Sequence, residues 1–477
     1  MALRKRSVGQ RRSSPAKRGG STSAAALASV EPLKRWLSEK GVRKAKVGGV
    51  DVDGVWRGKY ISLDKLLSAA MGGLGFCDVV FGWDIADDLY DNSKVTGWHT
   101  GYPDAQARID TSTARVIPWE PDVAAFLLDF VNADASPYEA SPRQLLQKIG
   151  GRAREMGFLP RFGSEFEYFI FRETAQTLRE KSFANLNPLT PGMFGYSWLR
   201  SSSNSALVHS ILDGCGGFGI EIEGMHTETG PGVYETAIRY DDLERAGDQA
   251  VLFKTAVKEI CARHGLTACF MAKWNSKLPG CSGHVHQSLW SADGGRNLFY
   301  DSAEAGGMSQ KLRHYVGGQL ELMPEFTAFY WPTINSYKRS VENTWAPVSA
   351  TWGHENRTTA LRTIGGGSKA TRIEFRLLGA DMNPYIGMAA SLAAGLWGIE
   401  NRVEPPAPCE GNAYRNDAPP LPRSLKDAIG VLRGSERARE LLGEGFVDHY
   451  LRTREWEVRQ FERAVTTWEL ERYLELI

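Results

Sequence analysis

Carboxylate, imidazole and guanidinium groups recur at a spacing of two residues in three segments of this chain. One residue separates Glu165 from Glu167, and one separates His284 from His286. Residues 372–376 alternate Arg, Ile, Glu, Phe and Arg. In an extended strand, residues two apart point to the same face, and two carboxylates about 7 Å apart there repel each other unless a cation lies between them. Because Glu, His and Arg bind metal ions and phosphate groups, the pattern predicts metal–phosphate chemistry.

We expect the three segments to be strands of one sheet, each with polar groups on one face and apolar side chains on the other. For any one segment, an ordinary amphipathic strand with a solvated face explains the alternation equally well. Solvated faces favour Lys, Thr and Ser, however, whereas these faces carry Glu, His and Arg. Together they predict a single sheet that lines one polar, metal-binding cavity.

The elements around these strands divide the chain into three parts. Residues 1–28 contain seven basic residues and no acidic one, so a disordered basic tail is expected, with an organelle transit peptide as the alternative. Residues 32–140 alternate short strand-like and turn-like pieces, which predicts a small α+β domain that includes a strand at 77–81. Ser141 followed by proline is a helix start, so a catalytic domain is expected from 141 to 477. The helices expected in it span 142–156, 241–264, 424–433, 436–442 and 454–473.

Composition agrees with a large enzyme. The 477 residues are 42% hydrophobic and 24% charged, which is enough for a large core and two or more domains. The net charge of +1 hides an acidic body of about −6, and a basic tail alone is weak evidence for nucleic-acid binding, so no nucleic-acid partner is expected. No apolar stretch of 18 residues occurs, so no membrane segment is expected. Six scattered cysteines without a CxxC pair fit a reducing compartment, and we expect a cytoplasmic protein without disulfides or a zinc site.

Two glycine-rich segments bear on nucleotide binding. Residues 214–219 resemble a dinucleotide-binding loop, but a strand-like stretch follows where that loop requires a helix, so we reject it. The chain also lacks a GxxxxGK[ST] loop. Residues 365–369, three glycines followed by Ser and Lys, could present backbone amides and one positive charge to a phosphate, although a plain flexible turn explains them equally well.

Seven motifs, in order, resemble those of the glutamine synthetase superfamily, from about residue 32 to the C-terminus. They are Gly163-Ser-Glu165-Phe-Glu167, Glu223-Gly-Met-His226-Thr-Glu228 continuing to Glu235, Gly283-His284-Val-His286-Gln-Ser288, Asn335-Ser-Tyr-Lys-Arg339, Asn356-Arg357 continuing to Arg362, Arg372-Ile-Glu374-Phe-Arg376 and Asn383-Pro-Tyr385. The resemblance implies an α+β fold with a small N-terminal β-grasp-like domain. It also implies a large C-terminal catalytic domain built on a curved antiparallel sheet.

The resemblance further implies ATP, glutamate and two to three Mg²⁺ (or Mn²⁺) ions. Carried over by position, the ligands of one metal are Glu167, Glu228 and Glu235, and those of the other are Glu165, His284 and Glu374. Five carboxylates and one imidazole form an oxygen-rich set that suits Mg²⁺ or Mn²⁺ better than zinc. For His226, the ordinary interpretation is a satisfied buried histidine or a group that supports a ligand.

The same resemblance implies roles for the remaining site residues. The positions that match nucleotide-binding residues are Glu223, His286, Ser288, Lys369 and Arg372. Those that match the surroundings of glutamate and its activated carboxylate are Gly280, Arg339, Arg357 and Arg376, while Arg362 would approach the transferring phosphate. For each arginine alone, the ordinary interpretation is a surface ion pair. The reaction implied has two steps: the γ-carboxylate of glutamate attacks the γ-phosphate of ATP, and an amine then displaces phosphate from γ-glutamyl phosphate.

Two departures from the family pattern concern the amine. Glutamine synthetases carry a Glu six residues after the Arg of the Asn-Ser-Tyr-Lys-Arg motif, and that position here is Trp345. An indole can shield the acyl phosphate, but it accepts no proton. The N-terminal loop whose Asp helps to bind ammonium is also missing, and Asp84 is its candidate counterpart. The sequence therefore predicts a γ-glutamyl ligase for an organic amine such as a polyamine, ethanolamine, an alkylamine or an aniline. True glutamine synthesis, a non-catalytic structural relative and a carboxylate other than glutamate are the alternatives.

Regulation and assembly follow from the same resemblance. The Asn-Leu-Tyr-Asp-Leu-Pro adenylylation loop is absent, and Tyr414 stands in Asn-Ala-Tyr-Arg without that context, so adenylylation is not expected. The family forms rings whose active sites lie between the C-terminal domain of one subunit and the N-terminal domain of the next. A homo-oligomer, a dodecamer of two hexameric rings, is therefore expected.

Overall fold

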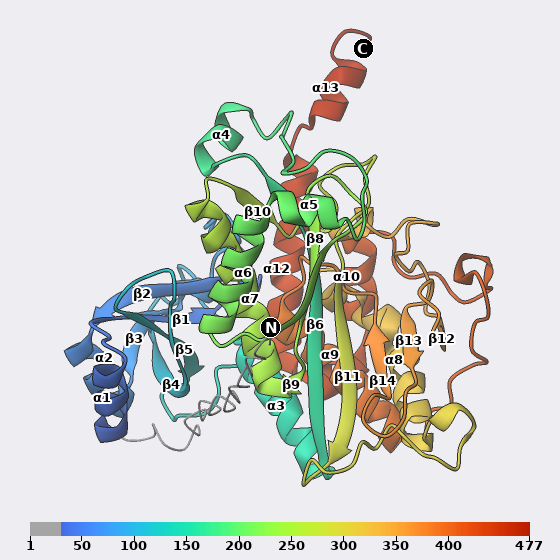
Figure 1. Cartoon of the computed structure of the whole chain (residues 1–477), viewed down its shortest axis with the longest axis horizontal. Coiled ribbons are helices and arrows are strands. Elements are labelled where there is room, and N and C mark those ends of the chain that lie inside the picture. The colour runs from blue at the N-terminus through green and yellow to red at the C-terminus, as the bar shows by residue number, and fades with distance from the viewer. Residues whose placement is uncertain (1–29) are drawn as a thin grey trace, which may run out of the picture.

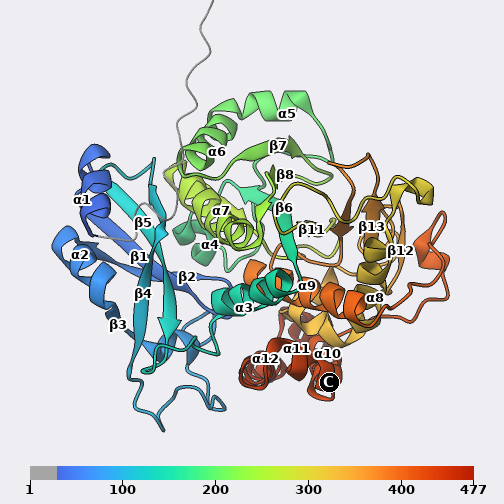
Figure 2. The same cartoon turned by 90° about the horizontal axis from the view of Figure 1, so that it is seen from below.

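The computed structural model describes residues 30–477, which form two β-sheets and the helices packed on them (Figure 1). The predicted tail, residues 1–28, lies outside the described residues. The expected mixture of helices and strands is confirmed. Figure 2 shows the smaller N-terminal sheet beside the larger body.

The N-terminal sheet has the strand order β2-β1-β5-β4-β3. Its strands are β1 (Lys44–Val50), β2 (Trp56–Ser62), β3 (Leu74–Cys77), β4 (Asp104–Val116) and β5 (Val123–Val131). β1 runs parallel to β5, and the other neighbours are antiparallel. Leu33 of α1 (Val30–Glu39) and Leu66 of α2 (Leu63–Gly72) are buried in one core with Phe126 and Phe130 of β5. The likeness of this sheet to a β-grasp domain and the limits 32–140 and 141–477 stay predictions.

The strand expected at residues 77–81 is wrong for most of its length. β3 ends at Cys77, which pairs with Asp104, the first residue of β4. Residues beyond Cys77 therefore have no strand beside them, and Asp78–Phe81 form a 3₁₀-helix instead.

The larger sheet has nine strands within the described residues and the central order β12-β13-β14-β11-β6-β8-β7. The strands are β6 (Phe158–Phe171), β7 (Ile222–Thr227), β8 (Val233–Ile238), β9 (Asp241–Asp242), β10 (Thr267–Cys269), β11 (Gly283–Ser291), β12 (Trp352–His354), β13 (Leu361–Ile364) and β14 (Arg372–Phe375). β9 and β10 pair with β6, and all neighbours are antiparallel except β12 and β13. β14, β11 and β6 are adjacent, which confirms that the three polar segments belong to one sheet. Figure 2 shows this sheet curved from β7 to β12.

Helices cover the apolar face of this sheet. They are α3 (Pro142–Glu155), α7 (Leu243–Arg263), α8 (Gln310–Tyr330) and α9 (Pro384–Glu400). Phe166 of β6 stacks on Phe253 of α7 with ring centroids 6.0 Å apart, and both rings are fully buried. Glu165 and Glu167, on either side of Phe166, are only partly buried. The alternation in β6 thus turns its aromatic rings into the core and its carboxylates toward the opposite face.

Three further helices are α4 (Ala175–Glu180), α5 (Trp198–Ser203) and α6 (Ser205–Gly217), of which α5 and α6 lie beside β7 (Figure 2). α6 ends within the glycine-rich segment 214–219, and a strand rather than a helix follows it. The rejection of a dinucleotide-binding loop is therefore confirmed.

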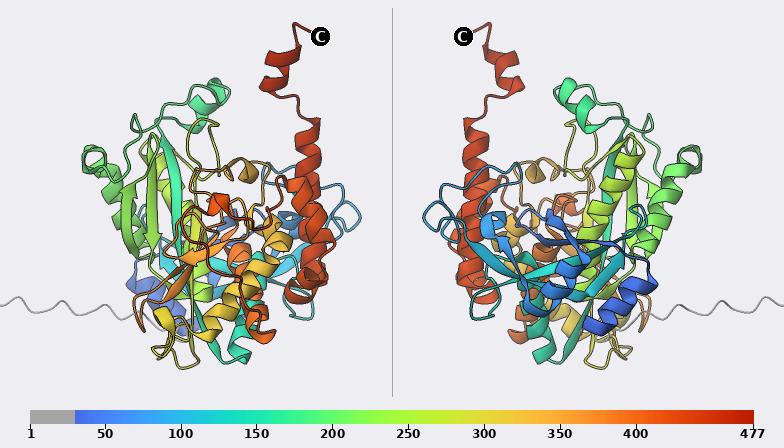
Figure 3. Two further views of the ribbon diagram at one scale, coloured as in Figure 1. Left: turned by 90° about the vertical axis from the view of Figure 1, so that its right-hand side faces the viewer. Right: turned by 90° about the vertical axis from the view of Figure 1, so that its left-hand side faces the viewer.

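The C-terminal region consists of α10 (Leu425–Arg433), α11 (Glu436–Leu442), α12 (Glu444–Arg463) and α13 (Thr467–Tyr473). The single helix expected at 454–473 is wrong. Thr466 and Glu469 form a capping box that starts a new helix after Ala464, and Figure 3 shows α13 projecting from the body. α12 also joins the N-terminal region, because Arg454 Nη2 donates to Asp53 Oδ1 at 2.7 Å.

None of the helices formed by residues 30–477 is long and apolar enough to cross a membrane. All six cysteines lie within the described residues and are free thiols, as expected.

Candidate active site

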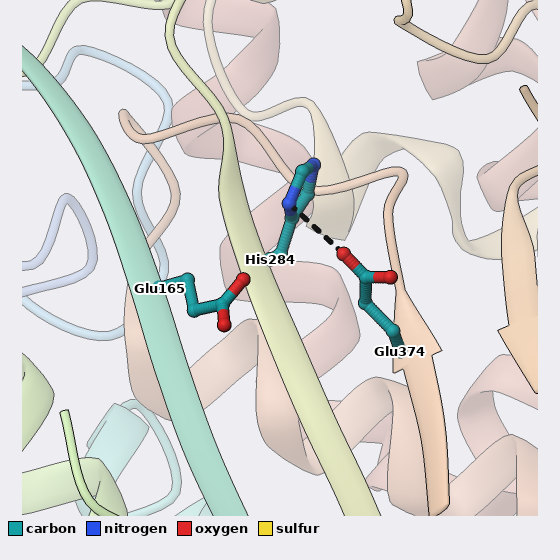
Figure 4. Close-up of side chains that lie close together, drawn as sticks. All are labelled: Glu165, His284 and Glu374. Carbon is teal, nitrogen blue, oxygen red and sulfur yellow. Dashed lines mark ion pairs between the residues drawn. The ribbon is translucent and has the colours of Figure 1, made fainter. Parts of the chain in front are cut away.

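The first acidic cluster unites three adjacent strands of the larger sheet. Glu165 on β6 lies opposite His284 on β11, and Glu374 comes from β14 on the other side of β11 (Figure 4). Each of the three residues offers a ligand atom within 4.8 Å of the others, and His284 Nδ1 lies 3.2 Å from Glu374 Oε1. The geometry brings together all three residues that were predicted to share one metal.

The protonation of this cluster suits a cation. Burial, followed by the nearby Arg376 and Arg339, lowers the pKa of His284 well below its usual value, so the imidazole is neutral and its nitrogens can act as ligands. His284 Nε2 is buried without a hydrogen-bond partner among the described residues. Burial alone would raise the pKa of Glu165, but His286, Arg372 and Arg376 together lower it. A carboxylate, a neutral imidazole and a second acidic group fit a divalent ion.

A second acidic cluster lies on β8 and at the end of the neighbouring strand β7. His226, Glu228 and Glu235 offer ligand atoms within 4.8 Å of one another, and His226 Nε2 lies 3.1 Å from Glu228 Oε1. Glu167 on β6 stands directly opposite Glu235, and its Oε2 accepts a hydrogen bond from the backbone N–H of Ser282 at 2.5 Å. The three carboxylates predicted to share the other metal are thus on one patch of the sheet.

The carboxylates of this second cluster repel one another. Burial, followed by Glu167 and Glu165, raises the pKa of Glu235 to about 9. Burial also raises the pKa of Glu167. A divalent ion placed between these carboxylates would offset the repulsion, so the donor set fits Mg²⁺ or Mn²⁺.

His226 was not predicted as a ligand. Its ring stacks on the ring of Tyr196, with centroids 4.3 Å apart and planes at 7°. The available signal was the alternation His226-Thr-Glu228 at the end of a strand, which puts both side chains on one face. Tyr196, thirty residues away, had no such signal.

Three of the predicted arginines meet at the first cluster. Arg376 Nη1 donates to Glu374 Oε1 at 2.6 Å, and Arg362 Nη1 donates to Glu374 Oε2 at 3.1 Å. Arg339 is buried and donates to the backbone carbonyl of Leu377 at 3.1 Å. Arg362 also forms an ion pair with the exposed Glu355, so the surface ion pair expected of an arginine is present beside its contact with Glu374.

Gly280 and Arg357 complete the set predicted around glutamate. A Cβ atom at Gly280 would come within 2.8 Å of Arg339 Cγ and 2.4 Å of a backbone oxygen, so only glycine fits against this arginine. Arg357 is exposed on the turn before β13.

The five predicted nucleotide-binding residues line one cavity of about 280 Å³. They are Glu223, His286, Ser288, Lys369 and Arg372. Arg372 Nε donates to His286 Nδ1 at 3.1 Å. The cavity also contains three residues that sequence reasoning missed, Arg161, Tyr240 and Trp290, and the Arg161 guanidinium lies 4.5 Å from the centroid of the Trp290 ring. It adjoins the first cluster through Glu165.

The two residues assigned to the amine lie in different environments. Trp345 belongs to an exposed loop, its side chain is 65% exposed, and its backbone has the left-handed φ of 62°. Asp84 is buried in the N-terminal region, where its Oδ2 accepts from Trp456 Nε1 of α12 at 2.8 Å. Its Oδ1 accepts from the backbone N–H groups of residues 86 and 88. Within one chain, Asp84 therefore connects the N-terminal region to α12.

Comparisons with known proteins show the family to which this chain is similar. Residues 139–473 match the family model of the glutamine synthetase catalytic domain. Type-1 glutamine synthetase 2 of Dictyostelium discoideum is 51% identical over 437 residues, which cover 91% of this chain and 84% of the relative. Glutamate–isopropylamine ligase of a Pseudomonas species is 38% identical over 449 residues, 93% of this chain and 98% of the relative. The solved structure of a GmaS–ADP complex superposes with a TM-score of 0.81 at 27% identity, covering 93% of this chain and 99% of that one. The chain belongs to the glutamine synthetase family.

Proposed function

We propose that this protein is an ATP-dependent ligase that joins glutamate to an organic amine and forms a γ-glutamyl amide by way of γ-glutamyl phosphate. The observation that carries the proposal is a contrast within the site. The acidic clusters and the arginines around Glu374 are complete, whereas the position of the ammonium-binding Glu of glutamine synthetases holds Trp345. A relative that is 38% identical is a glutamate–isopropylamine ligase, which supports an organic amine as acceptor.

The two acidic clusters would each hold one divalent ion, Mg²⁺ or Mn²⁺. The predicted number is two to three ions, and no residues are assigned to a third. Glu165, His284 and Glu374 would hold one ion, and Glu167, Glu228 and Glu235 another. Bound there, the ions would neutralise charge on the attacking carboxylate and on the phosphate. His226 would support the second set through its contact with Glu228.

The residues around the clusters would orient the two substrates of the first step. ATP would occupy the cavity lined by His286, Ser288 and Arg372, because basic and hydroxyl groups there can pair with phosphate and ribose oxygens. Arg339, Arg357 and Arg376 would hold glutamate, and Arg362 would face the transferring phosphate. Phosphoryl transfer depends mostly on such positioning and charge neutralisation, which supports this assignment.

The second step would depend on the exposed loop that carries Trp345. An indole at this point offers an apolar wall or a cation–π contact to the amine, but it accepts no proton from ammonium. The loop would cover γ-glutamyl phosphate and admit a substituted amine. Both a cationic polyamine and a neutral aniline are compatible with an aromatic wall.

Glutamine synthesis from ammonium is the second candidate. The relative with 51% identity carries the name of a glutamine synthetase, and this observation favours it. The two candidates share the ATP and glutamate sites and differ only in the acceptor.

A panel of acceptors distinguishes the candidates. Purified protein with Mg²⁺, ATP and glutamate is given ammonium, polyamines, ethanolamine, alkylamines or anilines, and phosphate and amide are both measured. The proposal requires at least one substituted amide to form faster than glutamine. If glutamine forms from ammonium faster than any substituted amide forms from the other acceptors, the second candidate is established instead.

We also propose that the protein assembles as a homo-oligomer, a dodecamer of two hexameric rings, with Asp84 contributing to the acceptor site of a neighbouring subunit. The contact of Asp84 with Trp456 keeps its carboxylate fixed beside α12. Light scattering at working concentration tests the assembly. An active monomer would contradict it and would remove the proposed role of Asp84.

The cytoplasm is our proposal for the compartment. It is supported by the six free thiols, because cysteines of secreted proteins commonly form disulfides, whereas those of cytosolic proteins stay reduced. Fluorescence imaging of the full chain with a C-terminal tag in cells tests it.

A further inference from the structure

Residues 409–414, which we call the brace, run from the turn that carries Arg357 to the loop that carries Trp345. Asn356 Nδ2 donates to the backbone carbonyls of Cys409 at 3.0 Å and Gly411 at 2.9 Å. Thr358 Oγ1 accepts from the backbone N–H of Ala413 at 3.0 Å. Both sequence neighbours of Arg357 therefore hold the brace between residues 409 and 413.

Tyr414 forms the other end of the brace. Its hydroxyl donates to the backbone carbonyl of Ala346 at 2.9 Å, directly after Trp345. Asn412 accepts from the backbone N–H of Tyr414 at 3.1 Å and starts the 3₁₀-turn Ala413–Arg415, which fixes the direction of the ring. Ala346 itself is buried, so the loop is attached to the body at this point.

The loop on the far side of this bond is otherwise lightly held. Ser340 Oγ donates to the carbonyl of Pro347 at 2.7 Å and closes its base, while residues 341–343 and Trp345 are exposed. Asn343 and Trp345 both have left-handed backbones, with φ of 62°. Such a conformation costs energy in a non-glycine residue and persists only where its surroundings hold it. The Tyr414 hydroxyl is the attachment nearest to Trp345.

The side chain of Tyr414 also lies in the electrostatic field of two arginines, Arg339 and Arg376. Burial raises the pKa of Tyr414, and the positive charges of Arg339 and Arg376 oppose that rise. Tyr414 thus holds the loop backbone by a hydrogen bond, and its hydroxyl is also influenced by the charges of Arg339 and Arg376. Hydrogen bonds therefore join both the Arg357 turn and the loop to this one segment.

We propose that Tyr414 is a positioning residue that holds the Trp345 loop over γ-glutamyl phosphate, so that the amine rather than water attacks it. The inference rests on the proposed function above. Without this bond, water would attack the γ-carbonyl carbon. A C–O bond to water forms, the C–O bond to phosphate breaks, phosphate leaves with the electron pair, and water releases a proton. The net reaction is then hydrolysis of ATP to ADP and phosphate, with glutamate regenerated.

The coupling ratio, phosphate released per amide formed, tests this role. Tyr414→Phe removes only the hydroxyl. We expect the ratio to rise about fivefold or more from its wild-type value near one, with the KM for ATP unchanged. Asn412→Ala, an exposed change that loosens the same turn, should raise the ratio less. Tyr450→Phe is the matched control, because its hydroxyl also donates to a backbone carbonyl, that of Ala328 at 2.7 Å, and lies in the helical core.

Hydroxylamine as a common acceptor separates this inference from the proposed function. It traps γ-glutamyl phosphate whichever amine the enzyme prefers, so the ratio can be measured even if the organic-amine proposal fails. A coupling ratio that stays near one in Tyr414→Phe, or amide and phosphate rates that fall together as in an ordinary destabilised variant, would overturn the inference. No turnover with hydroxylamine in the wild type would contradict both proposals.

Discussion

Glu167 and Glu235 lie directly opposite each other on the neighbouring antiparallel strands β6 and β8. Side chains at such paired positions share one face of the sheet, and like charges there are destabilising. Burial and this neighbour raise the pKa of Glu235 to about 9, so the metal-free protein avoids part of the repulsion by keeping a proton on this pair. A divalent ion would displace that proton, so a change at Glu235 should alter the response of the protein to metal.

We expect Glu235→Gln to abolish the metal response of the second acidic cluster alone, without weakening the metal-free fold. Mg²⁺ at 100 times its Kd for that cluster should stabilise the wild type there by about 2.7 kcal/mol, and this part of the gain should vanish in the variant. Phosphate release should fall about 100-fold or more. Glu221→Gln is the control, because Glu221 is exposed and pairs with Arg239. A thermal shift with Mg²⁺ that is as large in Glu235→Gln as in the wild type would remove Glu235 from the metal site.

Glu167→Ala and Glu374→Ala should both abolish phosphate release, but they should differ in stability. Glu374 is buried and accepts from Arg362 and Arg376, so its loss leaves two guanidinium groups without their shared carboxylate. We expect Glu374→Ala to lower the free energy of unfolding by about 3 kcal/mol. Removing Glu167 relieves repulsion and should cost little. Urea unfolding beside a phosphate assay checks both, and near-normal turnover in either variant would refute the site.

Trp345→Glu should shift acceptor preference toward ammonium. A carboxylate at the loop stabilises a bound ammonium ion and can take its proton, whereas an indole offers only the weaker cation–π contact. A change of about tenfold in the ratio of glutamine to substituted amide is expected, equivalent to about 1.4 kcal/mol. Trp345→Phe, which keeps an aromatic wall, serves as the control. An acceptor ranking that is identical in all three proteins would show that Trp345 does not select the amine.

The stability of the fold should decrease between pH 6.5 and pH 4 because of His449. This α12 residue is fully buried, neither ring nitrogen has a hydrogen-bond partner within residues 30–477, and burial lowers its pKa to about 4. The folded form stays neutral in this range while the unfolded chain, with a pKa near 6.5, takes up a proton. The stabilisation is therefore complete above pH 6.5 and is lost as the pH falls to 4, by about 3 kcal/mol in all.

His449→Leu should remove this part of the pH dependence. Urea unfolding of the wild type and the variant at pH 7.5 and pH 5 measures it. An equal loss of stability on acidification in both proteins would assign the effect to other groups.

The sequence by itself predicted which residues would carry the chemistry and determined which face of each strand they occupy. Alternation in Glu165-Phe-Glu167 and His284-Val-His286 is local, because a strand repeats every two residues whatever lies beside it. The family motifs likewise predicted five nucleotide-binding residues, and the structure gathers all five around one cavity.

Only the tertiary structure decided which of these faces meet. The register puts Glu165 opposite His284 and Glu167 opposite Glu235, and such pairing depends on the whole sheet rather than on either strand. The same reason explains the missed strand end at Cys77, where β4 supplies no partner. The bond from Tyr414 to Ala346 joins residues 68 apart in the chain. Contacts at that separation arise from packing, and no local pattern of residues encodes them.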